Sequence, residues 1–433
     1  MSRAAAEAKR SAVVEPSKPR LLGLLGPGLI TGASDDDPSG IGTYSQAGAQ
    51  FGFAISWTML FSYPLMVVIQ EISGRIGRTT GRGIAGNLRK FYPNWVLQII
   101  VLLLFVANTI NIAADLGAMG DATGLVIGGS PLLYVIFYGL FCSGTQILMQ
   151  YTKYVSVLKW LTVSLFAYFM TALVVKVHWD ELARGLFIPT VSSDVDFWTT
   201  VVAILGTTIS PYLFFWQASQ EVEDIKAVPE REPLVKSPSQ GPDALERIRL
   251  DTYVGMALSN LVGLAIIVTT AATLHVAGIT EIDTSSQAAE ALRPIAGSFA
   301  FAVFALGIVG TGLLSVPVLA GSAAYALGEA RGWPIGLARK PKDAVAFYAT
   351  LALATLGGSA INFLPVDPIK ALFWSAVING VVAVPVMSIM MLITTNRAIM
   401  GKFRISGPLR IIGWLATAVM AVATAGMLAG QLL

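Results

Sequence analysis

The segment Asp35-Asp36-Asp37-Pro38-Ser39-Gly40 interrupts an otherwise apolar stretch that runs from Leu21 to Phe53. Ionisable side chains inside a bilayer are costly, and they usually mark the path of an ion or a substrate. Proline and glycine break a membrane helix, and the backbone carbonyls that they free are tolerated only around a cavity. The segment therefore predicts a broken transmembrane helix with a cation site near the middle of the bilayer.

The composition of the chain is that of an integral membrane protein. Of the 433 residues, 55% are hydrophobic and 13% are charged, and the mean hydropathy is +0.68. Soluble domains carry about 25% charged residues. The single cysteine, Cys142, excludes a disulfide framework, and the two histidines, His178 and His275, argue against a zinc enzyme. Residues 1–20 are polar and lack the apolar core of a signal peptide, so we expect a cytoplasmic tail there.

Apolar segments of membrane-spanning length recur along the whole chain. A helix needs about 20 apolar residues to cross a bilayer, and about eleven segments approach that length. The polar stretch Glu221–Arg249 is rich in Pro, Glu and Lys, and we expect a mobile loop there. The predicted spans are 21–48, 53–77, 94–123, 131–150, 153–177, 199–220, 250–277, 297–327, 343–363, 367–394 and 408–431.

The charges in the loops predict the orientation of the chain. Arg and Lys gather after the second, sixth, eighth and tenth spans, whereas the intervening loops are short or acidic. Positive residues stay preferentially on the cytoplasmic side. We therefore expect a multi-pass protein of the plasma membrane (the inner membrane of a bacterial cell), with its N-terminus in the cytoplasm and its C-terminus outside. The first basic loop carries Arg75, Arg78, Arg82, Arg89 and Lys90.

A second interrupted span lies five spans after the first. It contains Gly206-Thr207-Thr208-Ile209-Ser210-Pro211-Tyr212, which places a proline among small polar residues. A packing kink explains either break alone. Interrupted helices at corresponding positions of two halves, however, indicate an inverted repeat with its binding site where the breaks meet. We expect an all-helical fold with two five-helix repeats, 21–178 and 199–394, and an eleventh helix at 408–433.

The residues at the two breaks predict a cation site built from oxygen ligands. The carboxylate of Asp37 is the main candidate ligand. Backbone carbonyls between Ser34 and Asp36, and at Thr207, add neutral oxygens, as do the hydroxyls of Thr207 and Ser210. Such hard ligands suit Mg²⁺, Ca²⁺ or Mn²⁺. For Thr207 and Ser210, ordinary packing of small residues is the alternative interpretation.

Three further residues of the first break also have predicted roles at this site. Gly40 has no side chain and contributes space. Asp35 and Asp36 either bind the ion or its water, or they face an aqueous vestibule, and both interpretations stay open.

Short motifs spread over the chain resemble the NRAMP divalent-metal transporters. The resemblance implies a LeuT-like inverted-repeat fold and the import of a divalent cation by alternating access. The motifs are Pro27-Gly28, Asp37-Pro38, Gln46-Ala47-Gly48-Ala49, Phe51-Gly52, Thr395-Asn396-Arg397 and Met400-Gly401.

Several positions depart from the NRAMP pattern. The first-helix motif of the family is Asp-Pro-Gly-Asn, and Gly40 takes the place of its Asn. The sixth-helix motif is Ala-x-x-Met-Pro-His, in which Thr207, Ser210 and Tyr212 replace Ala, Met and His. In the third span, Ala118 replaces the Glu of Asp-Leu-Ala-Glu. The sequence thus resembles the NRAMP-related magnesium transporters, a resemblance that implies a wider site without the thioether ligand and without proton coupling.

Other polar residues within the spans have simpler roles. Glu71 and Arg75 are four residues apart and predict an ion pair on one helix face. Asn108 and Asn111 predict hydrogen bonds between helices. Asp115 and Asp121 lie in or beside the third span, and they predict either a proton relay at one of them or a site at the outer helix end that attracts cations.

We therefore expect a monomeric secondary transporter that imports Mg²⁺, and also Mn²⁺, without protons, a cofactor or a nucleic-acid partner. A proton-coupled Mn²⁺/Fe²⁺ importer is the first alternative, and an organic-solute symporter on the same fold is the second. A receptor or scaffold leaves both breaks unexplained. An enzyme is not expected, because the sequence has no nucleophile–base pair and no phosphate-binding loop.

Overall fold

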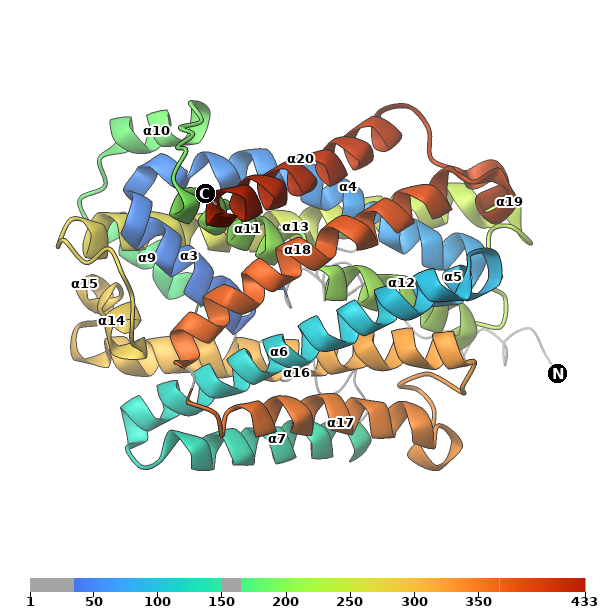
Figure 1. The fold of residues 1–433 in the computed structure, drawn as a ribbon, viewed down its shortest axis with the longest axis horizontal. Coiled ribbons are helices and arrows are strands. Elements are labelled where there is room, and N and C mark those ends of the chain that lie inside the picture. The colour runs from blue at the N-terminus through green and yellow to red at the C-terminus, as the bar shows by residue number, and fades with distance from the viewer. Residues whose placement is uncertain (1–34, 149–164, 366, 433) are drawn as a thin grey trace, which may run out of the picture.

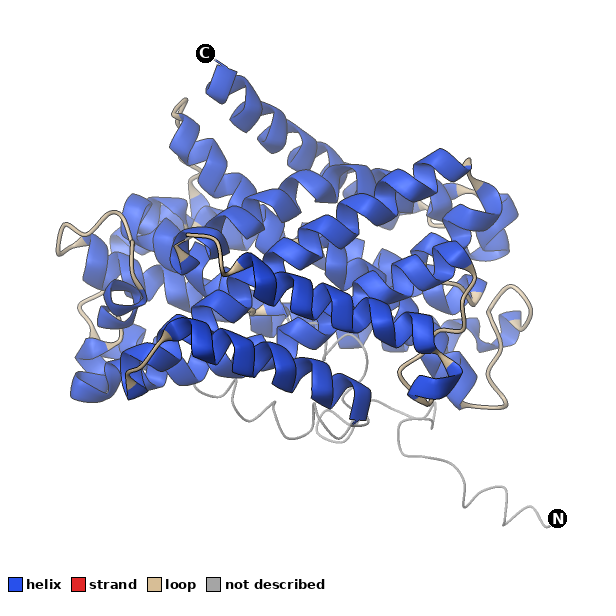
Figure 2. Cartoon of the chain, turned by 60° about the horizontal axis from the view of Figure 1, so that its bottom comes forward, coloured by secondary structure: helices blue, strands red, loops and turns tan. Residues whose placement is uncertain are grey.

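The structure is a computed structural model that describes residues 35–148, 165–365 and 367–432. Every long regular element in these ranges is a helix, and short loops connect the helices (Figures 1 and 2). The helices of the first half are α3 (Pro38–Phe51), α4 (Trp57–Thr80), α5 (Ile84–Phe91), α6 (Asn94–Ile127), α7 (Pro131–Leu148), α9 (Phe166–Val174) and α10 (Trp179–Phe187). Those of the second half are α11 (Val195–Thr208), α12 (Pro211–Ala227), α13 (Gly241–Thr270), α14 (Ser285–Glu290), α15 (Arg293–Ala296), α16 (Ala300–Arg331), α17 (Val345–Ile361), α18 (Pro368–Thr395), α19 (Arg397–Met400) and α20 (Gly407–Leu432).

The described helices confirm an all-helical polytopic fold. Seven helices in the described ranges are long and apolar enough to cross a membrane. The segments Pro38–Ile55 and Trp57–Thr80 pass the same test as a pair, bent by 108°. Helix α17 is a shorter apolar helix. Each predicted span thus overlaps a helix. Residues 1–34 and 149–164 lie outside the described ranges, and with them the predicted tail, Ser34 and parts of the first, fourth and fifth spans.

Both predicted breaks are present. Asp36 and Asp37 are not helical, and α3 begins at Pro38. Helix α11 ends at Thr208 and α12 begins at Pro211, so only two residues separate the halves of the sixth span. A proline stands at the first position of each outgoing helix, where its missing N–H leaves no intrahelical hydrogen bond unmade.

Close backbone contacts fix the helices around the breaks. A Cβ atom on Gly206 would lie 2.1 Å from the carbonyl oxygen of Ala376, so α11 and α18 pack with their backbones in contact. A Cβ atom on Gly312 would lie 2.4 Å from the sulfur of Met119 and 3.3 Å from Pro38, so α16 lies against α6 and the start of α3. Small residues permit such close approach between membrane helices.

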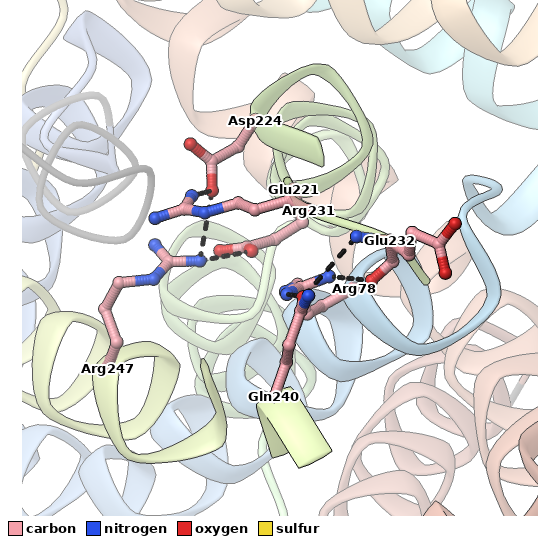
Figure 3. A network of polar contacts seen from close by, with 7 residues as sticks. All are labelled: Arg78, Glu221, Asp224, Arg231, Glu232, Gln240 and Arg247. Carbon is pink, nitrogen blue, oxygen red and sulfur yellow. Dashed lines mark hydrogen bonds and ion pairs between the residues drawn. The ribbon is translucent and has the colours of Figure 1, made fainter. Parts of the chain in front are cut away.

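The prediction of a loop across Glu221–Arg249 is wrong in extent. Helix α12 continues to Ala227 and α13 begins at Gly241, which leaves only residues 228–240 between them. The charged ends of the two helices are paired: Glu221 of α12 contacts Arg247 of α13, and Asp224 of α12 contacts Arg231 of the connection (Figure 3). The connection is also held by backbone hydrogen bonds from Leu234 and Val235 to the end of α4.

Candidate metal centre

Asp37 caps the helix that leaves the first break. Its Oδ1 atom accepts hydrogen bonds from the backbone N–H of Gly40 at 2.7 Å and from Ser39 Oγ at 2.6 Å. The first turn of a helix carries a partial positive charge that favours an anion. The predicted ligand is therefore oriented by its own helix, and its other oxygen is directed elsewhere.

The second carboxylate oxygen of Asp37 joins the first break to two other helices. Asp37 Oδ2 accepts hydrogen bonds from Asn111 Nδ2 of α6 at 3.1 Å and from Tyr212 Oη of α12 at 3.3 Å. Tyr212 is the second residue of the helix that leaves the second break. The two breaks therefore meet at the Asp37 carboxylate, as the sequence predicts.

Thr207 and Ser210 lie at the second break, but their hydroxyl groups differ in hydrogen bonding. Ser210 Oγ lies within hydrogen-bonding distance of the carbonyl oxygens of Gly206 (2.8 Å) and Thr207 (2.7 Å), which the end of α11 leaves without helical partners. The Thr207 hydroxyl is buried and has no hydrogen-bond partner among the described residues. Of the two predicted hydroxyl ligands, only that of Thr207 is thus without a partner in the described part of the chain.

Gly40 lies directly against the second break. A Cβ atom on Gly40 would lie 3.1 Å from the methyl carbon of Thr207 and 3.5 Å from Asp37 Oδ1. The Thr207 methyl group therefore lies next to the space that a side chain at position 40 would fill. Any larger residue at position 40 would enter the region between Asp37 and Thr207.

Asp35 and Asp36 contact a different helix from those that Asp37 contacts. Both contact Ser259 Oγ of α13, at 2.5 Å from Asp35 Oδ2 and 3.1 Å from Asp36 Oδ1. Their exposed fractions of 1% and 8% do not fit an open aqueous vestibule in this conformation. No group of three or more His, Cys, Asp or Glu residues that could hold a metal occurs in the part of the chain that the structure describes. The Asp36 carboxylate thus contacts Ser259 and does not share the hydrogen-bond partners of the Asp37 carboxylate.

Asp115 is a fourth buried carboxylate at this level of the bundle. It accepts a hydrogen bond from Ser315 Oγ of α16 at 2.7 Å and interacts with the backbone of Ser39. Its exposed fraction is 0%, so it does not lie at an outer helix end. Asp115 therefore belongs to the surroundings of the first break.

Other predictions about polar residues have mixed outcomes. Glu71 and Arg75 form the expected ion pair at 2.5 Å. Asn108 bonds across helices to Ser322 and to the carbonyl of Leu319, as expected. Asn111 also bonds across helices, but its partner is Asp37, which places it in the candidate site.

Sequence reasoning missed the roles of Asn111, Ser259 and Ser315. One signal could have identified Asn111, because it lies four residues before Asp115 in an apolar span and must share a face with it. Ser259 and Ser315 are single hydroxyls in apolar helices, where serine commonly packs against a neighbouring helix, so no signal in the sequence separates them from other serines.

The site has no permanent positive charge in the described part of the chain. The hydrogen-bond donors to Asp35, Asp36, Asp37 and Asp115 are hydroxyl, amide and backbone N–H groups, and none of the ion pairs formed by described residues includes these carboxylates. Buried charge without a counter-ion is strongly destabilising. The arrangement is therefore suited to receive a cation.

Comparisons with known proteins agree with this geometry. Residues 28–430 match the Nramp family model, described as natural resistance-associated macrophage protein-like. The divalent metal cation transporter MntH of Klebsiella pneumoniae (strain 342) is 26% identical over 429 residues, covering 95% of each chain. The protein of the same name from Aeromonas hydrophila subsp. hydrophila is 24% identical over 422 residues, covering 94% of this chain and 95% of its own.

Two solved structures share the fold of this chain. The Eremococcus coleocola manganese transporter superposes with a TM-score of 0.72 at 16% identity, covering 94% of this chain and 87% of its own. MhsT, crystallised with L-phenylalanine, superposes with a TM-score of 0.61 at 13% identity, covering 94% of this chain and 97% of its own. Together with the family match, which covers most of the sequence, these findings show that the chain belongs to the Nramp family of divalent metal cation transporters and is a transporter, not an enzyme.

Proposed function

We propose that this chain imports Mg²⁺, and also Mn²⁺, by alternating access and without moving protons. The observation that carries the proposal is the chemistry of the two breaks, where the candidate ligands are oxygens: the Asp37 carboxylate, the Thr207 hydroxyl and backbone carbonyls. Ser210 stands where the family pattern has a methionine, and its hydroxyl bonds to its own helix. Oxygen ligands without sulfur favour hard cations.

The surroundings of Asp37 suit an ion that keeps part of its water. Mg²⁺ requires near-octahedral geometry and usually binds through one or two carboxylates with several waters retained. Asn111 Oδ1 and Thr207 Oγ1 are both buried without a hydrogen-bond partner among the described residues. Thr207 Oγ1 can bind the ion directly or through a metal-bound water, and Asn111 Oδ1 can accept a hydrogen bond from such a water. Together with the Asp37 carboxylate, these oxygens fit a partly hydrated ion.

A residue of the second break, Tyr212, supports transport without protons. Tyr212 occupies the position at which the family pattern has a histidine, and its hydroxyl contacts Asp37. An inside-negative potential of 100 mV supplies about 4.6 kcal/mol to an incoming divalent ion, so import needs no coupled proton.

A proton-coupled Mn²⁺ importer is the second candidate. It is favoured by the names of the relatives, which include a manganese transporter, and by Asp115, a buried carboxylate beside the first break that the proposed ion binding does not use. An organic-solute symporter is less well supported, although MhsT shares the fold, because three acids at the first break would repel a substrate carboxylate.

Uptake into proteoliposomes that contain a pH-sensitive dye tests the proposal. We expect Mg²⁺ and Mn²⁺ to enter under an inside-negative potential, with no change of internal pH, and Asp37→Asn to reduce the uptake strongly. Acidification in proportion to metal entry would contradict uncoupled transport. Uptake of Fe²⁺ without uptake of Mg²⁺ would contradict the proposed selectivity.

A further inference from the structure

The acidic segment of the first break has a second side, which the Asp37 site does not use. Asp35 and Asp36 face α13, where both contact the Ser259 hydroxyl, whereas Asp37 faces α6 and α12. The two sets of oxygens therefore lie on different sides of one short segment.

The Ser259 hydroxyl cannot satisfy both carboxylates. It carries one proton, and its oxygen lies 2.5 Å from Asp35 and 3.1 Å from Asp36. Asp35 Oδ1 is buried and has no hydrogen-bond partner among the described residues. At least one acidic group on this side thus lacks the donors that a buried carboxylate requires.

Tyr44 supplies a separate observation at the same place. Its hydroxyl is buried and has no partner among the described residues. Its ring packs on Gly263, where a Cβ atom would lie 2.9 Å from the carbon that bears the hydroxyl. Gly263 is four residues after Ser259 and lies on the same face of α13. Tyr44 also interacts electrostatically with Asp35, Asp36 and, more weakly, Asp37, so an unpartnered hydroxyl adjoins the acids of the first break.

We infer that Asp35, Asp36 and Ser259, with Tyr44 beside them, form a second divalent-cation position next to the Asp37 site. Two carboxylates, one hydroxyl oxygen and water provide the hard ligands that Mg²⁺ and Mn²⁺ accept. The balance of charge agrees with two ions, because two divalent cations match the four buried carboxylates at positions 35, 36, 37 and 115. This inference rests on the proposed function, in that it takes the transported ion to be the occupant.

The stoichiometry of Mn²⁺ binding tests this position. Full-length protein in lipid nanodiscs is titrated with Mn²⁺, and the free ion is counted by electron paramagnetic resonance, with Mg²⁺ as competitor. We expect two ions per chain, the second bound more weakly because the ions repel each other. We expect one ion in the double variant Asp35→Asn/Asp36→Asn, and one in Asp37→Asn.

Two further variants distinguish a specific loss of the second ion from a loss caused by misfolding. Ser259→Ala should weaken the second ion about tenfold and leave the first unchanged, because it removes one ligand and no charge. Thr270→Ala removes another α13 hydroxyl, which bonds to its own helix, and should leave both ions in place. One ion per chain in the parent protein, or two in the double variant, would overturn the second position. One ion per chain in the parent protein, together with normal Mg²⁺ uptake, would leave the proposed function intact.

Discussion

Two clusters of carboxylates in this chain differ in how their negative charge is compensated. At the end of α12, Glu221 lies 2.5 Å from Arg247, and Asp224 contacts both Arg231 and Arg247 (Figure 3). At the first break, Asp35, Asp36, Asp37 and Asp115 have hydroxyl and N–H donors but no arginine or lysine partner in the described residues. Paired carboxylates serve the fold, because their charge is compensated permanently. Unpaired carboxylates leave room for a cation that comes and goes.

The paired cluster also explains how the connection between α12 and α13 is held. Arg78 of α4 donates to the carbonyl of Glu232 at 2.6 Å and to Gln240 Oε1 at 2.8 Å (Figure 3). Three helices and residues 228–240 are thereby tied together by guanidinium groups. The comparison predicts that substitutions in the paired cluster alter stability and that substitutions at the first break alter transport.

The largest effect is expected from Asp37→Asn. Loss of the charged ligand should reduce Mg²⁺ uptake by about 100-fold, the equivalent of a strong interaction with a charged group. The fold should persist, because Asn is as good a helix cap as Asp. Uptake by proteoliposomes and the melting temperature of the purified variant measure the two effects. Uptake within twofold of the parent would refute the role of Asp37.

Arg247→Met should destabilise the protein without a specific loss of transport. It leaves Glu221 buried without its partner, at a cost of about 2 kcal/mol, since the arginine itself is partly exposed. Thermal unfolding in detergent measures the loss. The double variant Arg247→Met/Glu221→Gln should recover most of it, and failure to do so would mean that the pair is not the cause.

Ser210→Met should shift selectivity toward softer ions. A thioether at the second break adds a ligand that favours Mn²⁺ and Fe²⁺ over Mg²⁺, by about tenfold in relative affinity. Competition between Mg²⁺ and Mn²⁺ for uptake measures the ratio. Ser210→Leu, which has similar bulk without sulfur, is the matched control, and an equal shift in both variants would argue against a thioether effect.

Thr207→Val should have the smallest effect. It removes a buried hydroxyl that has no protein partner among the described residues, so stability should be unchanged or slightly higher. If that hydroxyl accepts a hydrogen bond from metal-bound water, the KM for Mg²⁺ should rise about fivefold, or about 1 kcal/mol. An unchanged KM would assign Thr207 to packing.

The sequence predicts the positions of the breaks well, because an acid triplet and two Pro-containing segments within apolar spans are incompatible with continuous membrane helices. It does not predict the direction of each side chain. Helical periodicity stops at Asp36, so nothing in the spacing indicates that Asp35 and Asp36 face α13 while Asp37 faces α6. The loop predicted at Glu221–Arg249 is too long for a related reason, since polar composition does not reveal that charges from two helix ends pair with each other.

The position of bound Mn²⁺ in a crystal, located by anomalous scattering, tests the central claim most directly. The account predicts a peak about 2.1 Å from a carboxylate oxygen of Asp37, with oxygen atoms as its only ligands. A peak that lies away from both breaks, or that includes a sulfur or imidazole ligand, would contradict it.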